Sequence, residues 1–236
     1  MLASSTNVFL SSSSSDYIIV VIYGHLYRLA YSKPGDKAWT IINTWRGRYF
    51  DITYHKGQFY AINCKGMVMV FNFNGGDNPT EAQQVAQLPS ALLQYTFEYC
   101  YLLESAGALL IVTRQGMTAR PLTEHSSKWT YGTFGFQVFE VDLNTNTWTE
   151  IKDLGNRSIF VGHKSLFSVE VSDISYYKPN SIYYTDDCSD SYFSQRKGGG
   201  KDVGIYNMKD GSVIPLFRTN LLSRLCPPMW VEQSFK

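Results

Sequence analysis

The sequence predicts an all-β protein, a β-propeller of antiparallel blades with about four blades or an incomplete larger ring. Short runs alternate apolar and polar residues with period two, as in residues 137–143, where Phe139 and Val141 share one side. Gly, Asn and Asp separate these runs, and such residues favour tight turns. Units of this kind recur along the chain. Repeats of about 40–50 residues, each made of short strands, are typical of propeller blades.

The recurrence is marked by an aromatic residue in one strand of each hairpin, at Tyr27, Phe71, Phe139 and Tyr206. The separations are 44, 68 and 67 residues (71−27, 139−71 and 206−139). They are uneven because two of the units carry polar insertions. The pattern alone leaves open an antiparallel sandwich whose hairpins resemble one another by coincidence.

The elements follow in order after a Ser-rich stretch, residues 1–15, which we expect to be a disordered tail. The propeller domain is predicted over residues 16–230, with a short C-terminal tail at 231–236. The first unit has only three predicted strands before Trp45, at 17–23, 25–31 and 38–42. The other three units have four each, at 50–56, 58–64, 67–73 and 83–88; at 101–106, 108–114, 137–143 and 147–151; and at 165–171, 181–187, 203–209 and 212–217.

Composition limits the classes of function. Hydrophobic residues make up 44% and charged residues 17%, so the chain is expected to be globular. A net charge of +1 gives no argument for binding nucleic acid or a membrane. The four widely spaced cysteines indicate free thiols in a reducing compartment. With no visible secretory signal, we expect a cytoplasmic or nuclear protein, and an organellar leader is only weakly indicated.

Several segments together resemble the KIB-type β-propeller of plant F-box proteins. They are YFDITYHKGQFYAIN (49–63), YLLESAGALLIVTR (101–114), FQVFEVDLNTNTWTEIKDLGNRSIFVG (136–162), PNSIYYTDD (179–187), DVGIYNMKDGSVIPL (202–216) and PPMW (227–230). The resemblance covers roughly residues 39–230. It implies a non-catalytic protein-interaction propeller that recruits the substrate of a cullin-type ubiquitin ligase.

In proteins of that family an F-box precedes the propeller and binds a Skp1-type adaptor. No F-box is expected in this sequence, so binding of that adaptor is doubtful and binding of a substrate or regulatory protein remains. The first unit also lacks a predicted strand. We therefore expect an open fragment of a ring, which would associate with itself through its uncovered blade.

No catalytic constellation is evident, and we expect no enzyme, no cofactor and no metal site. The alternative is a propeller hydrolase or glycosidase with an unrecognised pair of carboxylates, for which the innermost strands offer only Asp51. Asp186, Asp187 and Asp190 are interpreted as a solvated acidic loop. The Gly-rich residues 198–201 are interpreted as a flexible linker.

A candidate partner-binding face follows from propeller topology. In an up-and-down blade, the loop between the second and third strands emerges on the same side as the link to the next blade. Both polar insertions, 115–135 and 188–201, are such loops, and the links 43–48 and 154–157 should join them. The expected binding residues, suited to an acidic or phosphorylated protein segment, are Trp45, Arg46, Arg48, Arg120, Lys128, Trp129, Arg157, Arg196 and Lys197.

Overall fold

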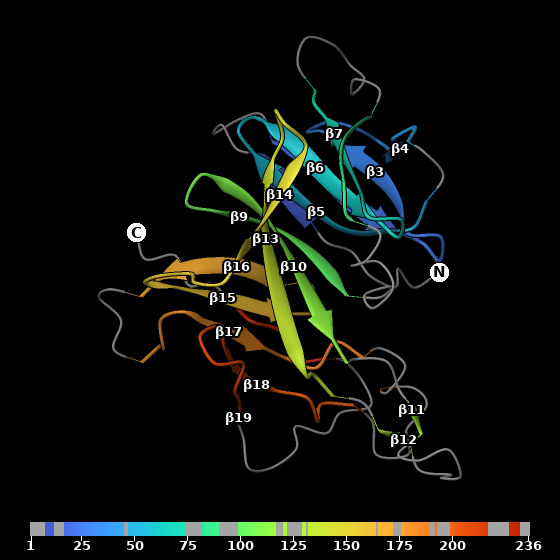
Figure 1. The fold of residues 1–236 in the computed structure, drawn as a ribbon. Helices are drawn as coiled ribbons and strands as arrows, with labels where there is room; N and C mark the ends of the chain where they lie inside the picture. Colours follow the sequence, from blue (N-terminus) through green and yellow to red (C-terminus); the bar gives the residue numbers. More distant parts are fainter. Residues whose placement is uncertain are drawn as a thin grey trace. The chain divides into compact units, whose positions relative to one another are not determined.

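The computed structural model describes residues 8–11, 17–44, 47–73, 82–89, 99–116, 120–121, 129–130, 132–163, 165–171, 176–188, 192, 199–216 and 227–231. The elements formed by these residues are β-strands, arranged in four open sheets and one two-stranded hairpin (Figure 1). The chain divides into two compact units. Unit 1 comprises residues 1–112 and 139–149, and unit 2 comprises residues 113–138 and 150–236. None of the described residues belongs to a helix long and apolar enough to span a membrane.

The first sheet has four strands rather than the three predicted. Its order is β1 (Val8–Ser11), β2 (Ile18–Tyr23), β3 (Arg28–Ser32) and β4 (Thr40–Ile41). β1 pairs antiparallel with β2, from Val8 opposite Val21 to Ser11 opposite Ile18. The prediction of a disordered tail is therefore wrong for these four residues, because the short apolar run in β1 pairs with the edge of the largely buried β2. The expectation of an open first blade rested on a missing strand, and β1 supplies that strand.

The second sheet is the predicted meander of β5 (Tyr49–His55), β6 (Gln58–Asn63), β7 (Met67–Phe71) and β8 (Gln83–Gln87). The tight reversal between β5 and β6 uses Lys56 and Gly57 with φ of 46° and 83°. Glycine adopts this left-handed conformation at little cost. One core cluster contains side chains from β2, β3, β5, β6 and β7, including the stacked rings of Phe59 and Phe71.

The third sheet also has the predicted strands, in the order β14 (Thr147–Ile151), β13 (Gly135–Asp142), β10 (Ala108–Gln115) and β9 (Cys100–Ser105). Its residues contribute to both compact units. Asn146 takes the left-handed conformation, with φ of 52°, in the turn between β13 and β14. The first polar insertion lies between β10 and β13 and contains the hairpin of β11 (Arg120–Pro121) and β12 (Trp129–Thr130).

The fourth sheet differs from the predicted blade by one additional strand. Its order is β16 (Ser165–Glu170), β15 (Arg157–Gly162), β17 (Ser181–Tyr184), β18 (Gly204–Asn207) and β19 (Val213–Pro215). β15, which was not among the predicted strands, lies between β16 and β17 and runs parallel to β17. The reason is burial: Phe160 is 2% exposed and stacks between Phe167 and Tyr183 at 5.0 and 4.8 Å.

A C-terminal strap, residues 227–231, packs on this fourth sheet. The backbone N–H of Trp230 donates to Ser165 Oγ at 3.0 Å, and its indole Nε1 donates to the Val161 carbonyl at 3.0 Å. The Thr185 hydroxyl donates to the Pro228 carbonyl at 2.9 Å. The strap is therefore tied to β15, to β16 and to the end of β17, all within unit 2.

The aromatic residues expected in the core fall into two groups. Tyr60 and Phe139 are buried, as predicted, and Trp148 is half-buried against a second core cluster in unit 1. Trp39 is 51% exposed, so its prediction as a core residue is wrong. It precedes β4, a two-residue strand whose residues are both exposed, and no sheet face covers it.

Candidate partner-binding site

The predicted binding residues are described to different degrees. The side chains of Arg48 and Arg157 are described, and Arg120 and Trp129 are placed only as backbone in β11 and β12. In that hairpin Arg120 pairs with Thr130 and Trp129 with Pro121, which makes the two predicted residues neighbours along the ladder. Outside the described residues lie Trp45, Arg46, Lys128, Arg196 and Lys197.

In unit 1 the link from β4 to β5 meets the turns between second and third strands, as propeller topology predicts. The Tyr49 N–H donates to the Tyr27 carbonyl, in the turn between β2 and β3, at 3.0 Å. The Cys64 N–H, in the turn between β6 and β7, donates to the Arg48 carbonyl at 2.7 Å. The link containing Arg48 is therefore fixed between two turns of the first and second sheets.

The Arg48 side chain is exposed and lies over an aromatic ring. Its guanidinium carbon is 4.7 Å from the centre of the Tyr27 ring. Stacking on a ring orients the guanidinium plane and leaves its edge able to donate hydrogen bonds to a carboxylate or phosphate. Arg48 thus has the geometry expected of a residue that recognises anionic groups.

Arg157 lies away from the insertion with which topology was expected to group it. Because β15 and β17 are parallel, Ser158 is opposite Ser181 at the beginning of both strands. The second insertion follows the other end of β17. The additional strand β15 therefore places Arg157 at the opposite end of the fourth sheet from Cys188, where the second insertion begins, and the expected grouping of Arg157 with that insertion is wrong.

The bases of the two insertions do meet, at a buried arginine in unit 2. Arg114 is 1% exposed, at the end of β10 where the first insertion begins. Its Nε donates to Thr133 Oγ1 at 2.8 Å, its Nη1 to the Thr185 carbonyl at 2.8 Å, and its Nη2 to Asp202 Oδ2 at 3.1 Å. Asp187 Oδ2 is 3.8 Å from Nη1. We call these residues the Arg114 node.

The Arg114 node spans both insertions because of where its members lie in the sequence. Arg114 and Thr133 flank the first insertion, and Thr185 and Asp202 flank the second. The Thr133 hydroxyl also donates to Asp202 Oδ2 at 2.6 Å, so the ends of the two insertions contact each other directly. The first insertion is closed further by backbone bonds from Gly132 and Phe134 to residues at the end of β10.

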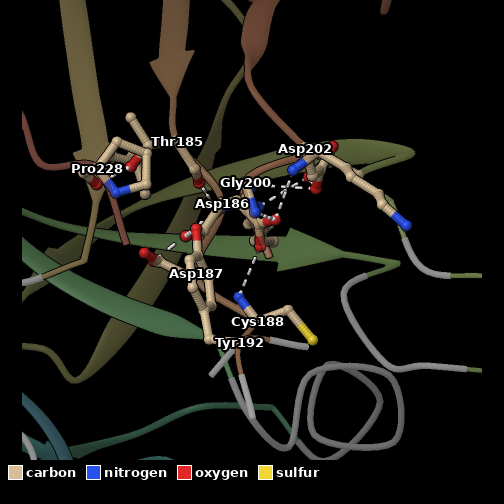
Figure 2. Close-up of polar contacts among 12 residues, drawn as sticks. Thr185, Asp186, Asp187, Cys188, Tyr192, Gly200, Asp202 and Pro228 are labelled. Carbon is tan, nitrogen blue, oxygen red and sulfur yellow. Dashed lines mark hydrogen bonds and ion pairs between the residues drawn. The ribbon is translucent and has the colours of Figure 1, made fainter. Parts of the chain in front are cut away.

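Asp186 closes the base of the second insertion (Figure 2). Its Oδ1 accepts the Cys188 N–H at 3.0 Å, and its Oδ2 accepts the N–H groups of Gly200 at 2.7 Å and Lys201 at 2.9 Å. The Tyr192 hydroxyl donates to the Asp186 carbonyl at 3.3 Å. One carboxylate therefore binds the backbone on both sides of the insertion, and charge-assisted bonds of this kind are among the stronger hydrogen bonds.

These contacts change two interpretations made from the sequence. Asp186 and Asp187 are 0% and 7% exposed, so they are not part of a solvated acidic loop; Asp190 lies outside the described residues. Gly200 and Lys201 are not a free linker, since both bind Asp186. The reason is that Asp186 accepts backbone N–H groups at both ends of the insertion and Asp187 lies close to the Arg114 guanidinium.

The electrostatics of the node are those of a desolvated site. Two aromatic rings that contact each other lie beside the Arg114 guanidinium, Tyr184 at 4.8 Å and Phe136 at 5.6 Å from its central carbon. Burial raises the pKa of the Tyr184 phenol, the nearby Asp202 raises it further, and Arg114 opposes both effects. Tyr184 therefore remains neutral, and the buried cation is balanced by carboxylates.

Asp51 and His55, which lie outside the Arg114 node, make contacts within the fold. Asp51 is 3% exposed, and its two oxygens accept the N–H groups of Ile52 and Leu102 at 2.9 and 2.8 Å. His55 is buried with its ring 6.0 Å from that of Tyr60. Within the part of the chain that the structure describes, no group of three or more His, Cys, Asp or Glu side chains is placed to hold a metal ion.

Reasoning from sequence missed the Arg114 node. The available signal was an arginine that ends the apolar run ALLIVT in β10, where a buried strand would not normally include a charge. Its partners are 19 to 88 residues away in the chain, so nothing in the local pattern indicated them.

Comparison with known proteins agrees with the resemblance. The family model of the KIB1-4 beta-propeller matches residues 2–207. F-box protein SKIP23 of Arabidopsis thaliana is 23% identical over 233 residues, covering 92% of this chain and 54% of that protein. F-box protein At4g35733 of the same plant is 26% identical over 228 residues, covering 92% and 56%.

A third relative, F-box protein At2g26160 of Arabidopsis thaliana, is 28% identical over 157 residues, covering 65% of this chain and 44% of that protein. The chain thus spans about half the length of these curated relatives. Together with the antiparallel sheets of the structure, the match over residues 2–207 identifies the chain as a member of the KIB1-4 beta-propeller family.

Proposed function

We propose that this chain is a non-catalytic protein-interaction propeller that recruits a protein substrate to a cullin-type ubiquitin ligase. The observation that carries the proposal is the alignment of F-box proteins such as SKIP23 along 92% of this chain. F-box proteins join a ligase adaptor to a substrate-binding domain. The similarity covers the propeller, so we assign to this chain the recognition of the substrate.

The geometry of the loops supports a role in binding. Loops that are fixed on a rigid sheet are common binding sites, and the Arg114 node and Asp186 fix the bases of both insertions in this way. The proposed binding residues are those predicted from the sequence without Arg157, which lies at the other end of the fourth sheet: Trp45, Arg46, Arg48, Arg120, Lys128, Trp129, Arg196 and Lys197. Their charge favours an acidic or phosphorylated partner segment.

The environment of the buried carboxylates supports a role without catalysis. Asp51 and Asp186 each use both oxygens to accept backbone N–H groups. A general acid or base must instead direct an oxygen at a substrate. These two carboxylates therefore act in the fold.

The test is capture of a partner together with its degradation. The tagged full chain is expressed in plant cells with and without a proteasome inhibitor, and captured proteins are identified by mass spectrometry. We expect a partner whose amount rises with the inhibitor and whose capture is lost in Arg46→Glu/Arg48→Glu. The matched control is Lys37→Glu/Lys56→Glu, two exposed lysines in the β3–β4 and β5–β6 turns at the other strand ends of their sheets.

Circular dichroism establishes that both double variants keep the fold. Equal capture by the two variants would remove Arg46 and Arg48 from the binding site. A captured partner whose lifetime does not depend on the chain would refute the role in a ubiquitin ligase and leave only binding.

A further inference from the structure

We propose that the strap, residues 227–231, occupies a recognition site for a tryptophan-bearing segment of a partner protein. The strap fills this site as an internal ligand, and a partner segment of the same chemistry takes its place. The inference does not depend on the proposed function, because the site shares no residue with the predicted basic binding face. The residues of the site, which we call the Trp230 slot, are Phe160, Gly162, Ser165, Tyr183 and Thr185.

The slot exists because one position of the fourth sheet has no side chain. Gly162 is the last residue of β15 and lies opposite Ser165 in the β15–β16 pair. A Cβ at this position would lie against the hydroxyls of Ser165 and Thr185, and 3.2 Å from Cδ1 of the Trp230 indole. Glycine in a strand often marks the place where a ligand or another backbone segment approaches closely. Gly162 therefore provides the space that the indole uses.

One side chain of the strap is recognised by its shape and by its polar group. The Trp230 ring meets the rings of Phe160 and Tyr183 edge to face, at 5.3 and 6.3 Å. Its Nε1 donates to the Val161 carbonyl at 3.0 Å. Phenylalanine has no such donor, so the slot favours tryptophan over other aromatic residues.

The other polar contacts of the slot are made to the backbone of the strap. The Ser165 hydroxyl accepts the Trp230 N–H at 3.0 Å, and the Thr185 hydroxyl donates to the Pro228 carbonyl at 2.9 Å. Thr185 is itself held in position, because its carbonyl accepts Arg114 Nη1 at 2.8 Å. A site whose groups are already fixed loses less conformational entropy when a segment binds.

The strap is attached as a short peptide ligand would be. Residues 227–231 belong to no strand, and the fourth sheet pairs its five strands without them. The side chains on either side of the tryptophan, Met229 and Val231, are 54% and 80% exposed, so the slot does not recognise them. Tyr177, whose ring is 5.1 Å from that of Phe160, is also exposed. Exposed apolar side chains beside a filled slot mark a surface for protein interaction.

Replacement of the strap by a partner segment follows from its few contacts. Three hydrogen bonds and one half-buried ring hold it, and a segment held in this way opens more easily than the buried strands beneath it. A partner segment binds while the slot is open. Its apparent affinity is therefore reduced by the fraction of time for which the slot is open, and the strap sets a threshold for the partner.

The first experiment supplies the strap as a separate molecule. The probe is the capped peptide Pro-Pro-Met-Trp-Val, which has the sequence of residues 227–231. The receptors are the unchanged full chain and its Trp230→Ala variant, and binding is measured by calorimetry. We expect saturable binding to Trp230→Ala that is about tenfold or more tighter than to the unchanged chain, where the strap competes. No binding to Trp230→Ala at peptide concentrations up to about 1 mM overturns the inference.

Variants of the peptide and the receptor test which features are recognised. A peptide with serine in place of both methionine and valine should bind within about twofold of the original, since those positions are exposed. A peptide with phenylalanine in place of tryptophan should bind about fivefold more weakly, because the indole hydrogen bond is lost. Adding Ser165→Ala to the Trp230→Ala receptor should weaken binding. The matched control is Ser212→Ala, an exposed serine in the turn between β18 and β19. Equal binding of the tryptophan and phenylalanine peptides overturns the inference.

The second experiment uses the unchanged chain, so it does not depend on the folding of Trp230→Ala. All five tryptophans are replaced by 5-fluorotryptophan, and Trp230→Phe identifies the fluorine NMR signal of Trp230. Excess unlabelled peptide should move that signal toward its position in the unfolded chain and leave the other four unchanged. A Trp230 signal that does not respond to the peptide overturns the inference. A signal that moves with protein concentration alone assigns the slot to the strap of a second copy and overturns the assignment to a partner protein.

Discussion

The strap at residues 227–231 gives the most direct test of how the fourth sheet is stabilised. Trp230→Ala removes the indole hydrogen bond to the Val161 carbonyl and two edge-to-face ring contacts, with Phe160 at 5.3 Å and Tyr183 at 6.3 Å. Val161 is fully buried, so water does not readily replace the lost donor. The strap lies beyond the residues that the family model matches.

The magnitude follows from these contacts. A buried carbonyl that loses its partner costs about 1–3 kcal/mol. Each edge-to-face ring pair contributes about 0.5–1.5 kcal/mol. Trp230 is itself only half-buried, so we expect Trp230→Ala to lower the free energy of unfolding of unit 2 by about 2–4 kcal/mol. Trp230→Phe keeps an aromatic ring but loses the indole hydrogen bond, and should lower the free energy of unfolding by about 1–2 kcal/mol.

The assay is urea unfolding followed by circular dichroism, with amide exchange in β15 to report on unit 2. Trp39→Ala is the matched control, because Trp39 is 51% exposed and should cost less than about 0.5 kcal/mol. If Trp230→Ala cost no more than Trp39→Ala, the strap would not stabilise the sheet and the reasoning from its contacts would be refuted.

Four further predictions follow from buried groups. Adding a methyl group in Gly162→Ala brings Cβ against the two hydroxyls that bind the strap, and should cost about 1–3 kcal/mol in urea unfolding; a neutral result would contradict the close packing. Trp148→Phe should cost less than about 1 kcal/mol, since the buried indole N–H has no partner among the described residues; a larger cost would show a missed bond. Burial lowers the pKa of the His55 imidazole, and Lys56 acts in the same direction. Below a pH of about 6.5 the unfolded chain therefore binds more protons than the folded chain, and the free energy of unfolding falls. His55→Gln should flatten that fall in a pH series of urea midpoints, and an unchanged slope would exclude His55 as its source. Burial, and secondarily Asp51, raise the pKa of the Cys100 thiol, so a disulfide reagent should label the half-exposed Cys64 before Cys100 in the native protein and label both of these residues in urea; early labelling of Cys100 would show that its sheet opens readily.

Much of the fold was predictable because strands and turns leave a local signature. The alternation around Phe139 and the turn at Asn146 predicted β13 and β14, and both strands are present. The four strands of the second sheet were likewise predicted in the order in which they pair. The family resemblance, confirmed over residues 2–207, then supplied the propeller class that hairpins alone did not distinguish from a sandwich.

The candidate site was predictable only in part. The Arg48 link lies next to turns of the first two sheets, because strand direction alternates in a meander; that it also joins the two insertions stays a prediction. The same rule misplaced Arg157, since β15 enters the fourth sheet parallel to β17 and reverses the end at which the link arrives. For Arg46, Lys128 and the other predicted residues outside the described part of the chain, the assignment stays a prediction.

Sequence by itself determined most of the segments that become strands, where the chain reverses and which family the propeller resembles, because each depends on residues close together in the chain. The tertiary structure alone decided which strand lies beside which and where buried polar groups find partners. Arg114 shows the reason: its charge is tolerable in the interior only because Thr133, Thr185 and Asp202 converge on it, and convergence of distant residues leaves no period in the sequence.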